Sequence, residues 1–447
     1  MRVIVVGAGM AGLTCARLLQ EHGVDVTVLE GGARVGGRAR TVRSVFEGGQ
    51  YVESGAEWID TDHHRMRELL DRYGLSLQGA GQEWTTIRRM LFRDGRMFTA
   101  EEVRAFEPAV EAQLEQYDQV FERIADGIVD PAHPDLHPEA SRHDARSLAA
   151  VAGEFDLGDL ATLFARRNSQ GEFAAEQHEV SALFVAQQRA QMRMHGVVGT
   201  VRAHRLEGGL DSLVAHMVAD LHDGTVQLGE MVQQVEWSAD AASGDAAGGV
   251  TVHTDRGVHR GTHVVLACSL VPLRSVRFVP ELPTPLALAV AELGYGTVTK
   301  TAVQFASRNW PAGYATTSLP SQRVYEPTAN QPGDAGVLMA YSGGDGGRRR
   351  AAFDEAHRIA RVSGDLREMF GVDSSQTGAF SRAWSNEPRF GGSYAAYGPG
   401  QVTAHWQVLR RPCGPIRLAG EHVSTWTGYL EGAVESGERV ATAITTT

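Results

Sequence analysis

The sequence predicts an α/β protein of two domains: a first domain built on a parallel sheet, and a second α+β domain that carries a helical cap. Three observations predict this fold. An apolar strand, a glycine turn, a helix and a second strand follow one another over residues 3–30; residues from about 66 to 203 are patterned as helices; and strand patterns return from residue 225. The 447 residues, 43% of them hydrophobic, are enough for two cores.

The N-terminal segment predicts one right-handed βαβ unit. Between its first strand, 3–6, and its helix lies Gly7-Ala8-Gly9-Met10-Ala11-Gly12, which matches G-x-G-x-x-G in the context that this motif requires. The first glycine permits a tight turn, the second lets the backbone approach a pyrophosphate, and the third allows close packing of helix on strand. Glu30 ends the second strand and would accept the ribose hydroxyls. The alternative is a purely structural glycine turn, and the motif leaves open whether NAD or FAD is bound.

The rest of the chain predicts a cap and a discontinuous first domain. Segments 101–126 and 176–194 carry apolar residues at helical spacing. Strands are expected at 225–229, 232–237, 250–254 and 263–267, with a polar hairpin loop at 239–249. A helix over 349–370 lies among further strands, and a strand at 416–419 precedes a terminal helix. The predicted cofactor domain comprises 1–76, 204–289 and 387–447, and the predicted substrate domain comprises 77–203 and 290–386.

Composition excludes several classes of protein. A formal charge of -12 argues against binding to nucleic acid or to anionic lipid. The three cysteines, Cys15, Cys268 and Cys413, are too scattered for a disulfide framework or a metal site. No uninterrupted apolar stretch reaches the roughly 18 residues of a membrane span. We therefore expect a cytoplasmic protein that binds a small molecule, without a metal, a membrane or a nucleic-acid partner.

A second motif, Arg34-Val35-Gly36-Gly37-Arg38, follows Glu30. Its glycines allow another backbone segment to approach the cofactor, and its arginines can donate to phosphate oxygens. One cradle would suffice for NAD, so this motif favours FAD. From here the sequence resembles the flavin-dependent amine oxidase family, which includes monoamine, polyamine and L-amino acid oxidases, and most resembles the monoamine oxidase branch. The resemblance continues at 55–59, 207–209, Val232, Lys300, Trp384, 391–394, 419–421 and 426–439, while Gly31-Gly32 departs from the family pattern.

The resemblance implies a Rossmann-type FAD-binding domain (GR2-like). It implies non-covalent binding as well, because Ser393 stands where some monoamine oxidases carry the cysteine that bonds to flavin. The first turn of the terminal helix would face the flavin pyrimidine. The residues expected to bind FAD are Gly7, Gly9, Met10, Ala11, Gly12, Glu30, Arg34, Gly36, Gly37, Arg38, Gly55, Ala56, Glu57, Trp58, Val232, Trp384, Gly420, Glu421, Tyr429 and Leu430.

Lys300 and two tyrosines are the candidates for the chemistry. Lys300 lies on a predicted strand among apolar residues, where a lysine usually reaches solvent; in the family, a lysine in this setting holds a water against flavin N5. Tyr394 and Tyr429 match the aromatic pair that encloses the amine. Trp426 would line the same wall, and Arg323 is a candidate to bind a substrate carboxylate.

Glu57 is unexpected beside a flavin, because related chains often have a small or neutral residue there. It could anchor a second cationic group, act as a general base, or bind a backbone or arginine donor in a structural role. Arg202, Arg205 and Arg323 are the candidate partners.

These residues predict an FAD-dependent oxidase that transfers a hydride from the α-carbon of an amine to flavin N5. The products are an imine and, after reoxidation by O2, H2O2. The alternatives are an L-amino acid oxidase, a biosynthetic amine or amide oxidase that traps its imine internally with Glu57 as base, and a flavin-binding protein without turnover. The oligomeric state is left open, with a homodimer as one option.

Overall fold

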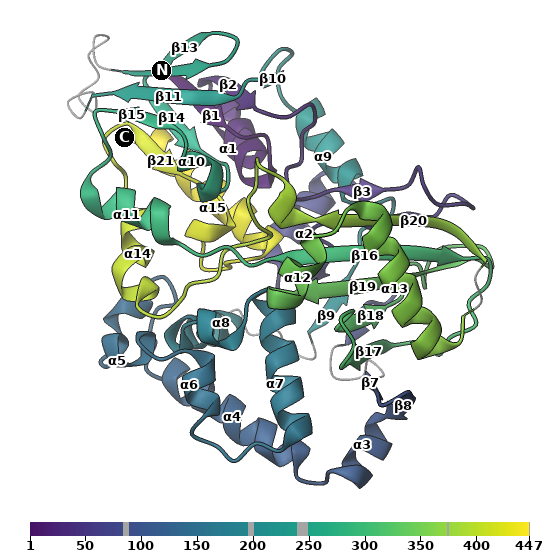
Figure 1. Ribbon diagram of the computed structural model, residues 1–447. Coiled ribbons are helices and arrows are strands. Elements are labelled where there is room, and N and C mark those ends of the chain that lie inside the picture. The colour runs from purple at the N-terminus through teal and green to yellow at the C-terminus, as the bar shows by residue number, and fades with distance from the viewer. Residues whose placement is uncertain (84–88, 195–200, 239–248, 373–374, 447) are drawn as a thin grey trace.

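A five-stranded parallel sheet forms the centre of the first domain in the computed structural model, which describes residues 1–83, 89–194, 201–238, 249–372 and 375–446 (Figure 1). The strand order is β10-β2-β1-β14-β21, and all neighbours are parallel. The strands are β1 (Arg2–Val6), β2 (Asp25–Glu30), β10 (Val226–Leu228), β14 (His263–Leu266) and β21 (Ile416–Leu418). Three separated pieces of sequence therefore meet in one sheet, and the predicted mixed α/β fold is confirmed. The exact domain boundaries stay a prediction.

The parallel sheet is covered on both faces, which explains why β1 is apolar throughout. Val3 and Val5 pack in a core with four helices, and Ile4 and Val6 pack in a second core on the opposite face. The four helices are α1 (Met10–Glu21), α2 (His64–Arg72), α9 (Leu210–Ala219) and α15 (Leu430–Thr445). The opposite face meets a sheet of order β13-β12-β11-β15, whose strands are β11 (Val232–Trp237), β12 (Val250–Thr254), β13 (Val258–Gly261) and β15 (Arg277–Val279).

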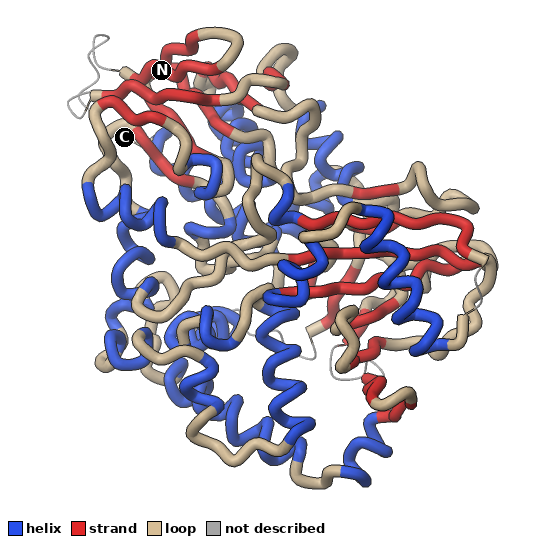
Figure 2. Tube along the Cα trace, viewed as in Figure 1, coloured by secondary structure: helices blue, strands red, loops and turns tan. Residues whose placement is uncertain are grey.

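A seven-stranded sheet forms the second domain, in the order β20-β16-β19-β18-β17-β7-β8 (Figure 2). Its strands are β7 (Arg89–Arg93), β8 (Arg96–Thr99), β16 (Val298–Phe305), β17 (Tyr314–Thr317), β18 (Arg323–Tyr325), β19 (Gly336–Gly343) and β20 (Gln376–Ala383). Helix α13 (Glu355–Phe370) covers one face, with Val303 and Phe305 beneath it. The alternate residues of β16, among them Lys300 and Ala302, point to the other face.

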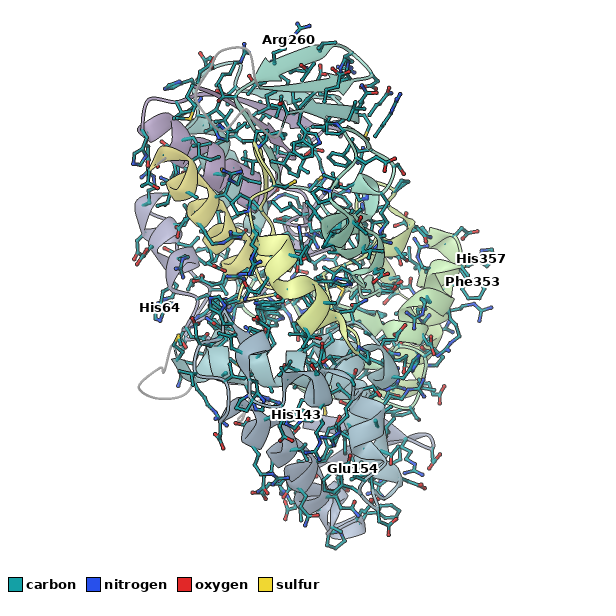
Figure 3. All side chains as sticks on the ribbon, turned by 90° about the vertical axis from the view of Figure 1, so that its left-hand side faces the viewer. His64, His143, Glu154, Arg260, Phe353 and His357 are labelled. Atoms are coloured by element: carbon teal, nitrogen blue, oxygen red, sulfur yellow. The ribbon has the colours of Figure 1, made fainter. Side chains whose placement is uncertain are left out.

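The cap is helical and lies at the end of the molecule remote from β13 (Figures 1 and 3). Figure 3 shows Arg260, on β13, at one end and Glu154, in the cap, at the other. The cap helices are α3 (Ala100–Phe106), α4 (Val110–Ala125), α5 (Ala140–Asp144), α6 (Leu148–Ala152), α7 (Asp159–Glu172) and α8 (Ala182–Met194), with 3-10 turns at Pro134–Leu136 and Gln177–Glu179.

Smaller elements connect the domains. The short strands are β3 (Thr41–Val42) paired with β4 (Val52–Glu53), and β5 (Ile59–Asp60), β9 (Arg202–His204) and β6 (Gln82–Glu83) in a three-stranded sheet. The other helices are α10 (Leu270–Leu273), α11 (Thr284–Glu292), α12 (Gly344–Ala351) and α14 (Gln401–Arg410), with 3-10 turns at Trp384–Asn386 and Glu421–Val423.

Three expected helices have different bounds. The segment 101–126 forms two helices, because Pro108 lacks an N–H and disfavours helical backbone at Glu107, where α3 ends. The segment 349–370 is divided as well, since the Asp354 side chain accepts a hydrogen bond from the His357 N–H and starts α13 anew. The third helix, expected over 176–194, begins only at Ala182, after a 3-10 turn. The hairpin loop expected at 239–249 lies almost wholly outside the described residues. Among the helices that are described, none combines the length and apolar character needed to cross a membrane.

Candidate functional site

A cavity of about 1060 Å³ lies between the parallel sheet and the seven-stranded sheet. This slightly exceeds the roughly 300–1,000 Å³ of ordinary ligand pockets, and it leaves room for a large cofactor and a substrate together. The predicted site residues that line it are Gly7, Gly9, Met10, Ala11, Glu30, Gly36, Gly37, Arg38, Gly55, Ala56, Glu57, Trp58, Val232, Lys300, Arg323, Trp384, Tyr394, Gly420, Glu421, Trp426, Tyr429 and Leu430. Of the predicted set, Gly12 and Arg34 are not among the lining residues.

The glycine turn after β1 presents bare backbone to the cavity. A Cβ atom built on Gly37 would lie 3.3 Å from the Cα of Gly9, so the two glycine motifs approach each other closely. No side chain caps the start of α1, and its first turn carries no acidic residue. The first N–H groups of this helix therefore carry its partial positive charge without a side-chain partner. Bare backbone donors of this kind fit the phosphates of a dinucleotide.

Glu30 and Arg34 are partly engaged by the protein itself. The Glu30 carboxylate accepts hydrogen bonds from the N–H of Ala8 at 2.9 Å and of Gly32 at 2.7 Å. The Arg34 guanidinium donates to the carbonyls of Val35 and Gly37. Arg34 thus holds the shape of the second glycine loop, and its predicted contact with a phosphate stays a prediction.

Arg38, which is partly exposed, and the buried Glu421 form an ion pair that joins distant loops. The Arg38 Nη1 atom lies 2.8 Å from Glu421 Oε1 and 2.7 Å from the carbonyl oxygen of Ser393. The other carboxylate oxygen of Glu421 accepts a hydrogen bond from the N–H of Gly428 at 2.9 Å. The pair therefore ties the second glycine motif to the segments that carry Tyr394 and Tyr429.

The register of the seven-stranded sheet places three polar side chains on the cavity wall. Lys300 pairs with Tyr341 across β16 and β19, and Tyr341 pairs with Arg323 across β19 and β18. Residues directly opposite each other in antiparallel strands share a face, and all three line the cavity. The same face carries Tyr325, whose ring stacks on Tyr314 with centroids 5.9 Å apart.

Lys300 is the only lysine in a chain with 42 lysine and arginine residues. It is 4% exposed, and its Nζ donates to Glu57 Oε2 at 2.7 Å, to the Gly55 carbonyl at 2.9 Å and to the Glu53 carbonyl at 3.2 Å. An ammonium has three N–H donors. All of them are directed at protein acceptors, so a water could join Lys300 only by replacing one.

The two predicted aromatic residues are held by different neighbours. The hydroxyls of Tyr394 and Tyr341 form a hydrogen bond at 2.7 Å, and each lies 3.2 Å from the Gly171 carbonyl, which accepts from the hydroxyl whose hydrogen is not used between them. The Tyr429 ring meets those of Trp426 and His63 edge to face, with centroids 5.8 Å and 5.3 Å apart. Each phenol is therefore fixed before a substrate arrives.

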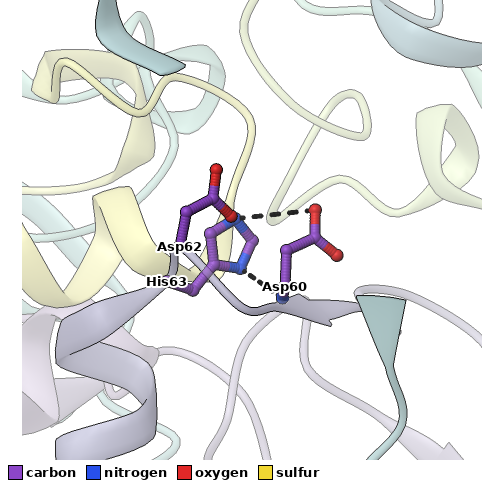
Figure 4. Close-up of side chains that lie close together, drawn as sticks. All are labelled: Asp60, Asp62 and His63. Carbon is purple, nitrogen blue, oxygen red and sulfur yellow. Dashed lines mark hydrogen bonds and ion pairs between the residues drawn. The ribbon is translucent and has the colours of Figure 1, made fainter. Parts of the chain in front are cut away.

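Asp60, Asp62 and His63 form a cluster (Figure 4), and the His63 ring contacts that of Tyr429. Burial, followed by the charge of Asp62, raises the pKa of Asp60 to about 7, and burial lowers the pKa of His63 to about 3. The Asp60 N–H donates to His63 Nδ1 at 3.0 Å, so Nε2 carries the hydrogen of the neutral ring. A protonated Nε2 cannot bind a metal ion, and the cluster does not suit one in this state.

Sequence reasoning did not single out Tyr325, Tyr341 or Tyr314, and it named Arg205 only as one of three candidate partners for Glu57. Arg205 does bind Glu57, as described below. Alternation along 323–325 and 339–341 would have placed these tyrosines on one face of each strand. The register that brings the strands together cannot be read from that pattern.

A parallel sheet that ends in a bare-backbone cradle, joined by one cavity to a second sheet, is an arrangement typical of oxidoreductases that bind an organic cofactor. The chain belongs to the family of flavin containing amine oxidoreductases, whose model matches residues 10–445. It is therefore a flavin-dependent enzyme of amine oxidation, as the sequence predicted.

Relatives match along nearly the whole chain. Amine oxidase [flavin-containing] A of Bos taurus is 28% identical over 464 residues, covering 98% of this chain and 84% of the relative. The L-amino-acid oxidase of Protobothrops flavoviridis is 24% identical over 457 residues, covering 97% and 87%. In fold, the chain is similar to cyclohexylamine oxidase from Brevibacterium oxydans IH-35A, with a TM-score of 0.86, 23% identity and coverage of 100% and 98%. It is equally similar to putrescine oxidase bound to putrescine, with a TM-score of 0.86, 22% identity and full coverage of both chains.

Proposed function

We propose that this enzyme binds FAD without a covalent bond and oxidises a C–N bond of an amine to an imine, with O2 as the final acceptor and H2O2 as a product. The observation that carries the proposal is that one cavity joins the glycine cradle to Lys300, Tyr394 and Tyr429. When bound, the flavin supplies the hydride acceptor and passes the electrons to oxygen.

The cofactor would be held along the length of the cavity. The N–H groups at the start of α1 would bind the phosphates, Glu30 the ribose, and the backbone at Val232 the adenine end. The start of α15, at Leu430, would place the positive end of a helix beside the flavin pyrimidine. Arg38 and Glu421 keep the surrounding loops in place.

The protein residues then orient the amine and set the charge around it. The rings of Tyr394 and Tyr429 restrict the approach of the substrate, which aligns its α-carbon with the cofactor, and they can attract a cationic amine. Lys300 supplies a fixed positive charge where negative charge develops during oxygen reduction. Because its three hydrogens are already bonded, we assign its effect to charge.

A second candidate, oxidation of L-amino acids, is favoured by Arg323. This residue lines the cavity on the same sheet face as Lys300. Its Nε is buried and has no hydrogen-bond partner among the residues that the structure describes. A guanidinium in this setting suits a substrate carboxylate.

Anaerobic reduction of the purified enzyme by a panel of substrates tests the function. We expect at least one amine to bleach the flavin, and air to restore the colour with release of H2O2. The panel pairs each L-amino acid with the amine left after removal of its carboxylate. Faster bleaching by the amino acids would select the second candidate, and no bleaching by either set would contradict both.

We also expect acid denaturation to release the flavin. Ser393 lines the cavity with its Oγ bonded to the Gly296 carbonyl at 2.8 Å, and a serine cannot form a thioether. The precipitate should be colourless, and mass spectrometry of the supernatant should find FAD. Yellow colour that remains in the washed pellet, or release of FMN alone, would contradict this assignment.

A further inference from the structure

Both carboxylate oxygens of Glu57 accept hydrogen bonds from protein donors. Its Oε1 accepts a hydrogen bond from Arg205 Nε at 2.7 Å, and its Oε2 accepts hydrogen bonds from Lys300 Nζ at 2.7 Å and the Tyr325 hydroxyl at 2.5 Å. Burial alone would raise the pKa of Glu57, but the charges of Lys300 and Arg205 and the hydrogen bonds outweigh burial and lower it to about 2. A carboxylate so acidic, with both oxygens bonded to protein donors, is a poor general base.

Arg205 is held from two sides. Its side chain is 8% exposed, and the guanidinium carbon lies 3.9 Å from the ring centroid of Trp58, a cation–π distance. The guanidinium also lies 5.8 Å from the ring centroid of Tyr325, and its hydrogen bond to Glu57 orients the carboxylate. Arg205 is not one of the lining residues of the cavity, so it can affect the cavity only through its charge and through Glu57.

The ionic group of Lys300, Glu57 and Arg205 carries an excess charge of +1. Such a group would be costly in a protein interior without a compensating anion. Glu53 is a carboxylate neighbour of both Glu57 and Lys300. Burial raises the pKa of Glu53 to about 7, so its carboxyl is mostly neutral below pH 6.

We propose that Arg205 and Glu57 form a positioning clamp that fixes the ammonium of Lys300 at the cavity wall and leaves one net positive charge beside the bound flavin. This inference rests on the proposed function, in which Lys300 faces the cofactor. Glu57 and Arg205 are positioning residues, and neither exchanges a proton with the substrate. The clamp also explains why position 300 carries a lysine and not an arginine, because a compact ammonium can meet three convergent acceptors whereas a planar guanidinium cannot.

The net charge of the clamp is tested by the reduction potential of the bound flavin. This potential is measured without turnover, by equilibration with redox dyes at pH 6. Glu57→Gln raises the excess charge to +2 and should raise the potential. Arg205→Met lowers the excess charge to zero and should lower the potential. Tyr325→Phe removes a hydrogen bond to Glu57 without changing the charge, and should shift the potential least. A purely structural role would move the first two variants in the same direction, and that result would overturn the proposal.

Selective isotope labelling of lysine tests whether the clamp fixes the position of the Lys300 ammonium. Because the chain has one lysine, protein grown with ¹⁵N-lysine gives a single Nζ signal, which can be assigned without ambiguity. We expect that signal to be visible in the wild type and in Tyr325→Phe, which keeps the charge of Glu57, and broadened by exchange with solvent in Glu57→Gln. An unchanged signal in Glu57→Gln would overturn the clamp. Should Glu57→Gln fail to fold, both measurements are made on Arg205→Met, with Tyr325→Phe as its control.

A double-mutant cycle separates this inference from the function on which it rests. If Glu57 acts through Lys300, adding Glu57→Gln to Lys300→Met should change the rate of flavin reoxidation less than twofold, although Glu57→Gln alone slows it at least about fivefold. Full additivity would contradict the clamp. Wild-type reoxidation in Lys300→Met itself would contradict the proposed function.

Discussion

Replacement of Lys300 by methionine is expected to slow the reoxidation of the bound flavin by oxygen by about 10²-fold or more, the usual effect of removing one preorganised charge partner from a buried site. Oxygen gains negative charge when it accepts electrons, and the fixed ammonium lies in the cavity wall where it can stabilise that charge. The measurement is stopped-flow mixing of the anaerobically reduced enzyme with oxygen, monitored by the return of flavin absorbance.

The reductive half-reaction and an arginine variant are the controls for Lys300. Reduction by the amine should change less than the oxidative step, because Tyr394 and Tyr429 orient the substrate. Lys300→Arg keeps the charge but cannot reproduce contacts of 2.7 Å, 2.9 Å and 3.2 Å to three convergent acceptors. We therefore expect only partial recovery. Equal slowing of both half-reactions would indicate general damage to the site and contradict a specific role in oxygen reduction.

Replacement of Gly12 by alanine is expected to yield protein that has lost most of its flavin. The added Cβ would lie 2.0 Å from the Gly7 carbonyl oxygen and 3.3 Å from the Ala267 Cβ. These are backbone and core atoms that cannot move aside, so the start of α1 would shift away from the turn that forms the cradle. The ratio of flavin to protein absorbance after purification measures the effect.

Gly364→Ala is the matched control for Gly12→Ala. Gly364 lies within a helix too, and an added Cβ there would meet nothing within 4 Å. Because glycine costs roughly 0.5–1 kcal/mol relative to alanine inside a helix, this variant should keep its flavin and gain stability. Full flavin content in purified Gly12→Ala would show that the third glycine is not needed for close packing.

The local features of the fold were predictable because the residues that cause them are adjacent in sequence. The apolar strand, the glycine spacing and the helix of the first unit match β1, the turn and α1. The predicted helix bounds were wrong where one residue interrupts a run of apolar residues at helical spacing. Pro108 and Asp354 each divide a segment whose apolar spacing alone favours a single helix.

Lys300, Glu57 and the two predicted tyrosines could be selected as candidates from the sequence, yet their relations could not. The sequence left Glu57 open as a base, a second cation site or a structural acceptor. The structure shows both oxygens bonded to Arg205, Lys300 and Tyr325, residues far apart in the chain. Which groups neutralise a buried charge depends on strand register and on the packing of β9 against β5.

The sequence by itself determined the dinucleotide cradle, the second glycine motif and the family, since turns, close backbone approach and helix starts are encoded over a few consecutive residues. Only the tertiary structure decided the surroundings of the single lysine, Lys300. Its ammonium binds the Glu57 carboxylate, and Arg205 binds the same carboxylate. A charge buried away from water must find its partners in space, and the three partners of Glu57, namely Arg205, Lys300 and Tyr325, come from three separate segments of the chain.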